Sequence, residues 1–139
     1  MDLNSKLPNK LIINIDWSDV DVFAHVNNVM IFKYIQAARV SYWQRVGISV
    51  LPLEDKPAVI LASCNCDFKK PLFFPGLVYI SSGCCYLGNS SFKLIHEFRD
   101  DASEICAIAE DVIVMFDYEL NTSKPIEAAL RTKILELEA

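Results

Sequence analysis

The residues best suited to chemistry in this sequence lie within one short segment, DVDVFAHVNN, at positions 19–28. This segment, called the polar loop below, contains Asp19, Asp21, His25, Asn27 and Asn28, separated only by small or apolar residues. A carboxylate just before a helix can serve as a general base for water or attack a carbonyl carbon directly. Unpaired N–H groups at the helix start can then stabilise the negative charge on the carbonyl oxygen. The polar loop therefore combines a possible base or nucleophile with a possible anion-stabilising helix start, provided that a helix follows it.

Each of these residues also has a purely structural interpretation. An aspartate before a helix is often only a turn or capping residue, and this applies to Asp21. Asn27 and Asn28 are interpreted primarily as helix-capping residues, although Asn28 is also a reasonable contact to a substrate. His25 could act as a base, but four residues from Asp21 it can equally hold the loop by hydrogen bonds. Residue types and spacing alone leave both interpretations open.

The elements that must position the polar loop are a strand before it and a helix after it. Residues 10–17 alternate between apolar and polar, which predicts a strand with Leu11, Ile13, Ile15 and Trp17 on one face. Residues 28–46 have helical spacing, with Asn27 or Asn28 as the N-cap and Gly47 as the stop. The apolar arc of this helix is wide and predicts that other elements enclose most of it: Ile31, Phe32, Ile35, Ala38, Tyr42 and Val46.

The rest of the sequence predicts a sheet that can cover this helix. Strands are expected at residues 58–70, 77–87, 90–98 and 104–119, joined mostly by short turns, with a hairpin turn at Gly88–Asn89. Residues 126–137 read as a short, partly exposed helix. The pattern predicts an α+β fold in which a curved antiparallel sheet wraps around one long central helix. The 139 residues have the size of one domain, so a single domain over residues 1–139 is expected.

Composition excludes several classes of function. A net charge of −5 and a pI of about 4.9 disfavour nucleic acid as a partner. No apolar run reaches membrane-spanning length, and the N-terminus lacks the pattern of a signal peptide. Five cysteines without scaffold spacing indicate a reducing, cytoplasmic location. The cysteines lack zinc-site spacing and are expected to pack as apolar side chains, and His96 is expected in the core or at an interface.

Several segments together resemble the hotdog-fold acyl-CoA thioesterases of the 4-hydroxybenzoyl-CoA thioesterase type. The most specific one is DWSDVDVFAHVNNVMIFKYIQAARVSYW, residues 16–43, with its Asp-x-Asp and His-Val-Asn-Asn elements. CNCDFKKPLFFPG (64–76) is similar to the family's second strand and following turn. LGNSSFKLIHEF (87–98) is similar to its hairpin, and DYELNTSKP (117–125) to the end of its final strand.

This resemblance implies roles for individual residues. Asp21 matches the family's catalytic carboxylate, which leaves Asp19 as a structural partner of the loop. The thioester carbonyl would be held by backbone N–H groups in the Asn27–Asn28 region. Ser91 matches a position that approaches the site. Gln36 departs from the family, since many relatives carry an acidic residue there, and this affects the surroundings of the acyl group.

The function expected from the sequence is hydrolysis of an acyl-CoA thioester to a carboxylic acid and coenzyme A. Lys69 and Lys70 either meet the phosphates of coenzyme A or form a solvated strand end. The resemblance implies no metal and no further cofactor, a homodimer or homotetramer with shared sites, and possible use of acyl carrier protein in place of coenzyme A. Two alternatives are a non-catalytic acyl-binding hotdog protein and a hotdog enoyl-CoA hydratase. The hydratase ranks lower, because its Asp-to-His spacing is one residue longer and includes Asn-Pro.

Overall fold

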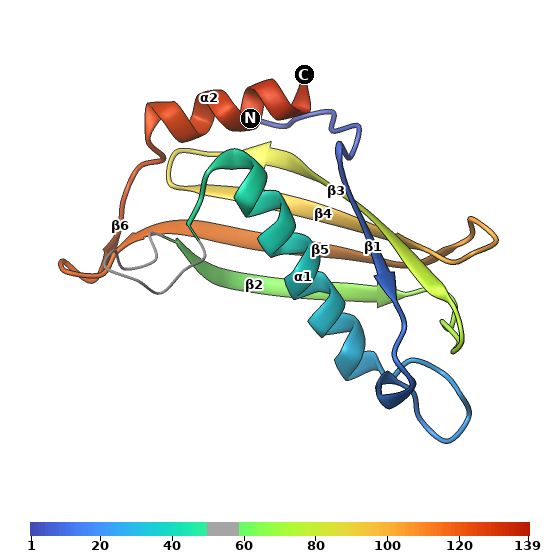
Figure 1. The fold of residues 1–139 in the computed structure, drawn as a ribbon. Coiled ribbons are helices and arrows are strands. Elements are labelled where there is room, and N and C mark those ends of the chain that lie inside the picture. The colour runs from blue at the N-terminus through green and yellow to red at the C-terminus, as the bar shows by residue number, and fades with distance from the viewer. Residues whose placement is uncertain (50–58) are drawn as a thin grey trace.

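A computed structural model describes residues 1–49 and 59–139, and its main element is a curved antiparallel sheet of six strands (Figure 1). The long helix α1 (Asn28–Val46) lies across the concave face of this sheet. In spatial order the strands are β1 (Asn9–Asn14), β3 (Leu77–Leu87), β4 (Ser91–Arg99), β5 (Ile105–Asp117) and β2 (Val59–Phe68). The short β6 (Thr122–Ser123) pairs with the end of β5, and α2 (Ala128–Glu138) follows. The predicted α+β class, with a sheet around one long helix, is confirmed.

Helix α1 begins and ends at the predicted residues because both ends carry suitable caps. Asn27 is the N-cap, and its side-chain oxygen accepts a hydrogen bond of 3.0 Å from the Val29 N–H. Gly47 ends the helix in the left-handed conformation, with φ of +86°, which favours glycine. The start of α1 is therefore fixed directly after the polar loop.

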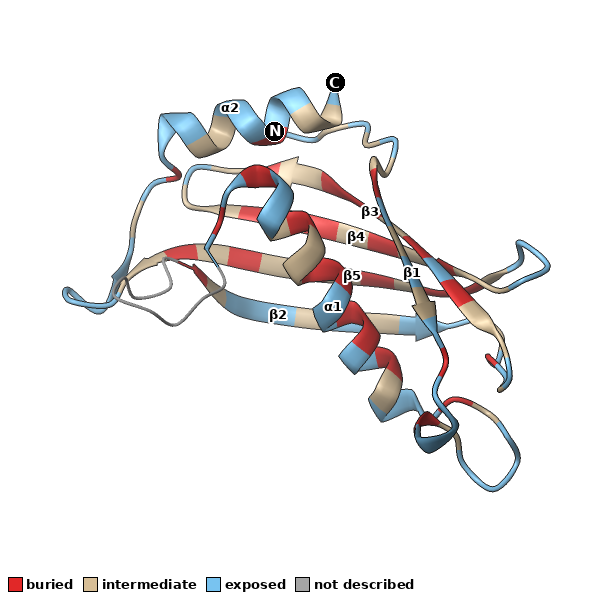
Figure 2. Cartoon of the chain, viewed as in Figure 1, coloured by how far each residue is buried: buried red, intermediate tan, exposed pale blue. Residues whose placement is uncertain are grey.

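The burial of α1 differs from the prediction that other elements enclose most of it. Ile35, Ala38 and Tyr42 belong to the core clusters and have no exposed surface. Figure 2 shows the alternation of buried and exposed positions along α1. Away from the buried face, Val29 is 69% exposed. Phe32, whose ring packs edge-on against Phe68 of β2, is still 40% exposed. The apolar arc is wider than one sheet can cover, so this side of the helix stays open in the single chain.

The N-terminal strand is shorter than predicted. β1 ends at Asn14, and the chain turns into a 3₁₀-helix at Trp17–Asp19. Trp17 therefore does not share the inner face of the strand but is 73% exposed. The turn forms because Asp16 caps it, accepting a hydrogen bond of 2.9 Å from the Ser18 N–H.

The prediction of short turns between the strands is correct for β3–β4 but wrong for β2–β3. The Gly88–Asn89 hairpin forms, with the Gly88 N–H donating to the Ser91 carbonyl at 2.8 Å. In contrast, β2 pairs with β5 at one edge of the sheet, while β3 lies beside β1 at the other. Residues 69–76, called the crossover below, connect them by passing the end of the sheet near the start of α1. The predicted first residue of this strand, Ala58, lies outside the described residues.

The core contains two apolar clusters, one on each half of α1. One cluster includes Ile31, Ile35 and Ala107, and the other includes Tyr42, Phe92 and Ile113. Within the described residues, no helix is both long and apolar enough to cross a membrane. The first cluster lies beside the polar loop and the crossover, and it is this end of the molecule that holds the candidate site.

Candidate functional site

The polar loop is a tight turn organised by Asp21. Val20 and Val26 form an isolated antiparallel bridge at its base, and the Asp21 N–H donates to the His25 carbonyl at 2.9 Å. One side-chain oxygen of Asp21, Oδ1, accepts hydrogen bonds from the N–H groups of Phe23 at 2.9 Å and His25 at 3.2 Å. Asp21 itself is exposed. Two backbone donors thus orient this carboxylate while its other oxygen, Oδ2, faces no donor in the part of the chain that the structure describes.

The crossover holds the polar loop in place. Val26 donates its N–H to the Leu72 carbonyl at 2.8 Å, and Phe74 donates to the Ala24 carbonyl at 3.2 Å. The His25 ring packs edge-on against Phe73, with ring centroids 4.7 Å apart. Ala24 has a φ of +62°, a left-handed conformation that is costly for a residue with a Cβ. The loop therefore adopts a strained turn that its neighbours fix, which is common at functional sites.

Asp19 ties the polar loop to α1 through its side chain and its backbone carbonyl. It is 4% exposed and accepts a hydrogen bond of 2.8 Å from the Tyr34 hydroxyl. The Lys33 ammonium lies 3.6 Å from its other oxygen, and the Asn27 N–H donates to its carbonyl at 3.0 Å. Burial, followed by the hydrogen bond to Asp19, raises the pKa of Tyr34 well above its ordinary value. Tyr34 therefore stays protonated as the donor of this bond.

The helix start leaves one backbone donor unused. The Asn27 N–H bonds to Asp19, and the Val29 N–H bonds to the Asn27 side chain. The Asn28 N–H lies between them and donates to no acceptor among the described residues. It is at the positive end of a helix of 19 residues, where a negative oxygen is stabilised.

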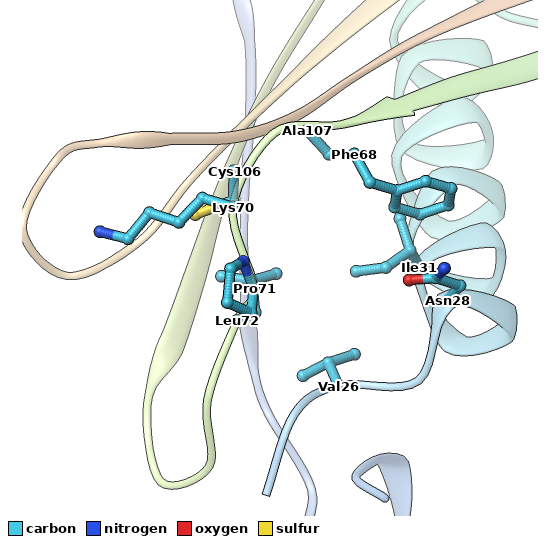
Figure 3. A pocket seen from close by; sticks show the side chains of 9 residues that line it. All are labelled: Val26, Asn28, Ile31, Phe68, Lys70, Pro71, Leu72, Cys106 and Ala107. Carbon is cyan, nitrogen blue, oxygen red and sulfur yellow. The ribbon is translucent and has the colours of Figure 1, made fainter. Parts of the chain in front are cut away.

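Beside this donor is a small pocket between α1 and the crossover (Figure 3). Its volume is about 210 Å³, and one wall is Asn28 with Ile31 pointing inward. The remaining walls come from the polar loop, the crossover, the end of β2 and the start of β5: Val26, Phe68, Lys70, Pro71, Leu72, Cys106 and Ala107. The pocket is therefore mostly apolar, with the helix start at its rim, and this suits an acyl group.

Lys70 lines the pocket with its aliphatic stem, while its ammonium points away (Figure 3). The ammonium pairs with Asp100 at 2.9 Å and also with Glu104. The hydrogen bonds to Glu104 and then to Asp100 raise the pKa of Lys70. Lys69 is exposed and forms no ion pair within the described ranges. Of the two lysines expected to meet phosphates, Lys69 is therefore the one whose charge is not already paired.

The other expected site residues do not all gather at this pocket. His25 and Asn27 support the polar loop, and the exposed Asp21 lies outside the pocket lining of the single chain. Ser91 lies near the opposite end of the sheet. It pairs with Val114, whereas the pocket reaches Ala107, about 24 Å away along β5 at about 3.4 Å per residue. Ser91 therefore cannot join the helix start of its own chain.

Sequence reasoning missed the pocket walls on the crossover and on β5. Leu72 and Cys106 are apolar or weakly polar, so their residue types do not suggest a site. The one signal in the sequence was that the segment between β2 and β3 is too long for a tight hairpin turn and could therefore line a pocket. Burial raises the pKa of the Cys106 thiol to about 11, so it is not a thiolate nucleophile. In residues 1–49 and 59–139 no three metal-ligating side chains lie together as a metal site would require.

Comparisons with known proteins show the family and the fold of this chain. The family model of the thioesterase-like superfamily matches residues 15–134. A Thermus thermophilus structure described as a thioesterase complexed with coenzyme A and Zn is 27% identical, with a TM-score of 0.82 over 94% of each chain. A Synechocystis 1,4-dihydroxy-2-naphthoyl-CoA thioesterase has a TM-score of 0.81 over 94% of this chain and 97% of its own, but at 15% identity it shows the fold alone.

Among curated proteins, the uncharacterized protein YsmA of Bacillus subtilis is 25% identical over 109 residues, which cover 77% of this chain and 71% of YsmA. The family match spans most of the sequence, including the polar loop, α1 and all strands from β2 to β6. The fold predicted from the resemblance is that of the thioesterase structures. The chain therefore belongs to the thioesterase-like superfamily and has its hotdog fold.

Proposed function

We propose that this protein is an acyl-CoA thioesterase that hydrolyses its substrate to a carboxylic acid and free coenzyme A. The observation that carries the proposal is the unused N–H of Asn28, a residue that starts α1 and lines an apolar pocket. The family supports thioester hydrolysis in general. The Thermus relative that was solved with coenzyme A supports coenzyme A as the carrier here.

In the proposed reaction, the acyl group enters the pocket and its carbonyl oxygen accepts a hydrogen bond from the Asn28 N–H. Negative charge develops on this oxygen as the carbonyl carbon is attacked, so the helix start binds the transition state more strongly than the substrate. One such donor contributes about 2.7–4 kcal/mol in other enzymes. Asp21 supplies the catalytic carboxylate, through the Oδ2 atom that the loop donors leave unoccupied. It either takes a proton from the water molecule that attacks the carbonyl carbon, or attacks that carbon itself to form a mixed anhydride that water then hydrolyses. In both routes water supplies the new oxygen of the acid and the carbon–sulfur bond breaks. The thiolate of coenzyme A then leaves and takes a proton.

The site is proposed to form between subunits of a homodimer or homotetramer. Asp21 and the pocket do not meet within one chain, so the carboxylate would complete the pocket of a partner. β2 is an open sheet edge of ten residues, which pairs readily with a second copy. The exposed apolar side chains around the polar loop would be covered by the same contact: Val22, Phe23, Val29, Phe32, Phe68 and Phe73.

Lys69 is the proposed contact to the phosphates of coenzyme A, because Lys70 is already paired with two carboxylates. A cation at the crossover would then fix the carrier while the acyl group fills the pocket.

The test is release of free thiol from short, long and aromatic acyl-CoAs, with the same acyl groups offered on acyl carrier protein. The proposal predicts turnover of at least one acyl-CoA, faster than its carrier-protein counterpart. Binding of acyl-CoA with no hydrolysis of any of them would instead support the non-catalytic acyl-binding alternative. Formation of a hydroxyacyl product without thiol release would indicate a hydratase.

A further inference from the structure

A row of buried polar side chains crosses the inner face of the sheet beneath α1. It runs through four neighbouring strands, from Asn9 on β1 to Ser82 on β3, His96 on β4 and Asp111 on β5. Ser82, His96 and Asp111 have no exposed surface, and Asn9 is 1% exposed. Together with the two α1 residues that contact it, Arg39 and Ser41, this row is called the polar belt below.

Directional contacts link the members of the polar belt. The Ser82 hydroxyl lies 2.6 Å from His96 Nδ1, and His96 Nε2 lies 2.8 Å from Asp111 Oδ2. Arg39 Nε donates to Asp111 Oδ2 at 2.8 Å, and Arg39 Nη2 donates to Oδ1 at 3.0 Å. This two-point pairing fixes the guanidinium in both distance and angle.

A catalytic role for the belt itself is excluded by its burial. Ser82, His96 and Asp111 follow the order of nucleophile, base and orienting carboxylate in hydrolases. Ser82 has no exposed surface, however, and none of the three lines the pocket. A substrate carbonyl cannot reach the Ser82 hydroxyl, so the belt must act through its contacts with α1.

The belt holds α1 on both of its sides. Arg39 reaches across to Asp111 on β5, while Ser41 accepts a hydrogen bond of 3.1 Å from the Asn9 side chain on β1. The apolar clusters on either half of the helix provide area but little directional preference, since apolar packing tolerates shifts that conserve volume. The polar belt lies between these clusters and supplies the hydrogen bonds from the middle of α1 to β1 and β5. Arg39 Nη2 also lies 3.7 Å from the Cys64 Sγ on β2, a longer and weaker contact.

We propose that the polar belt sets the axial position of α1 over the sheet, so that Arg39, Asp111, His96 and Ser82 are positioning residues for the helix start. Arg39 lies about 16 Å along the helix from Asn28, at about 1.5 Å per residue, and the intervening turns transmit its position. A slide of α1 would move the Asn28 N–H relative to the pocket wall on the crossover, which is attached to the sheet. The expected change in kcat rests on the proposed function, whereas the expected shift of the helix start does not.

The first test compares Arg39→Lys with the wild type at a temperature where both are folded. Lysine keeps the positive charge opposite Asp111 but loses the two-point geometry. A displacement of about 1 Å at a reacting centre can lower the rate about a hundredfold, so kcat is expected to fall at least tenfold. KM is expected to change less than about threefold, because the pocket walls on the crossover remain. Gln44→Ala, on the exposed side of α1, is the matched control and should leave kcat unchanged.

A second variant separates positioning from stability. Arg39→Met, Ser82→Ala, His96→Leu and Asp111→Leu together give an all-apolar belt, and such replacements of buried ion networks keep or raise stability in other proteins. The proposal predicts a folded protein with kcat reduced at least tenfold and with shifted ¹⁵N–¹H resonances for Asn28 and Val29. A folded all-apolar variant with kcat within about twofold of the wild type and unshifted resonances would overturn it.

Two further outcomes remain interpretable: an all-apolar variant that does not fold, and a wild type that hydrolyses no thioester. If the all-apolar variant does not fold, Ser41→Ala removes the contact to β1 alone and is expected to shift the same two resonances. Unshifted resonances in Ser41→Ala and Arg39→Lys would then overturn the proposal. If the wild type hydrolyses no thioester, the proposed function fails, but the resonances still report whether the belt positions the helix start.

Discussion

Replacing Asp111 with Asn should destabilise the protein strongly. The change keeps the shape of the side chain but removes the negative charge that pairs with Arg39, whose side chain is 9% exposed. Breaking one partner of a buried ion pair costs about 3–5 kcal/mol because the other charge is left uncompensated. With an unfolding entropy of about 2.1 cal/mol/K per residue over 139 residues, this corresponds to a fall in Tm of about 10–17 °C.

The pH dependence of this loss tests its electrostatic origin. Burial alone would raise the pKa of Asp111, but hydrogen bonds and charges from His96 and Arg39 outweigh it and lower the pKa from 3.8 to about 2. A carboxyl with a lowered folded-state pKa stabilises the protein above about pH 4, and this contribution is lost as the pH falls toward 2. The gap in unfolding free energy between wild type and Asp111→Asn should therefore shrink by roughly 2 kcal/mol over that range.

The assay is thermal and urea unfolding followed by circular dichroism from pH 7 down to pH 2.5. Asp2→Asn is the matched control, because Asp2 is exposed and forms no ion pair within the described residues. It should melt within about 1 °C of the wild type, as surface substitutions do. A fall in Tm below about 3 °C for Asp111→Asn, or a gap that does not change with pH, would refute the role given to this ion pair.

Three further predictions follow from the site. Asn27→Ala removes the cap on the Val29 N–H and should lower stability by about 1 kcal/mol, measured by urea unfolding, whereas Asn27→Ser should retain it. Lys69→Ala should raise KM for acyl-CoA several-fold in steady-state kinetics while kcat stays unchanged, because it removes binding that is equal in substrate and transition state. Leu61→Asp places a charge on the edge strand β2, where Leu61 is 40% exposed, and should convert the proposed oligomer to monomers by light scattering, with loss of activity.

Much of this fold follows from local sequence patterns. The limits of α1 were predictable because an asparagine cap and a glycine stop act within a few residues of the helix ends. Strands β1 to β5 were predictable to within a few residues from their alternation, whereas the two-residue β6 was not predicted. The place of β2 at the far edge of the sheet was not, since strand order depends on pairing between residues distant in sequence.

The candidate site also has a part that local sequence patterns predict and a part that depends on contacts between distant residues. The polar loop and the helix start were predictable because their residues carry recognisable chemistry at fixed spacing. The polar belt was not predicted beyond the expectation that His96 lies in the core or at an interface, and the structure buries it in the core. A signal was present: Asp111 occupies an inward position of the alternating β5 run, and Arg39 lies on the buried face of α1 between Ile35 and Tyr42. A charge at an inward position requires a buried partner, but the sequence does not say which element provides it.

The most direct test of the proposed site is turnover of the best acyl-CoA substrate by Asp21→Asn, measured beside Asp2→Asn. Asparagine keeps an oxygen for the Phe23 and His25 N–H groups but removes the basic and nucleophilic carboxylate. General-base catalysis contributes about 10²–10⁴-fold, so kcat should fall at least about a hundredfold while a non-hydrolysable analogue still binds within about threefold of the wild type. A fall in kcat of less than about tenfold would contradict the account, because Asp21 would then only organise the loop and the catalytic carboxylate would lie elsewhere.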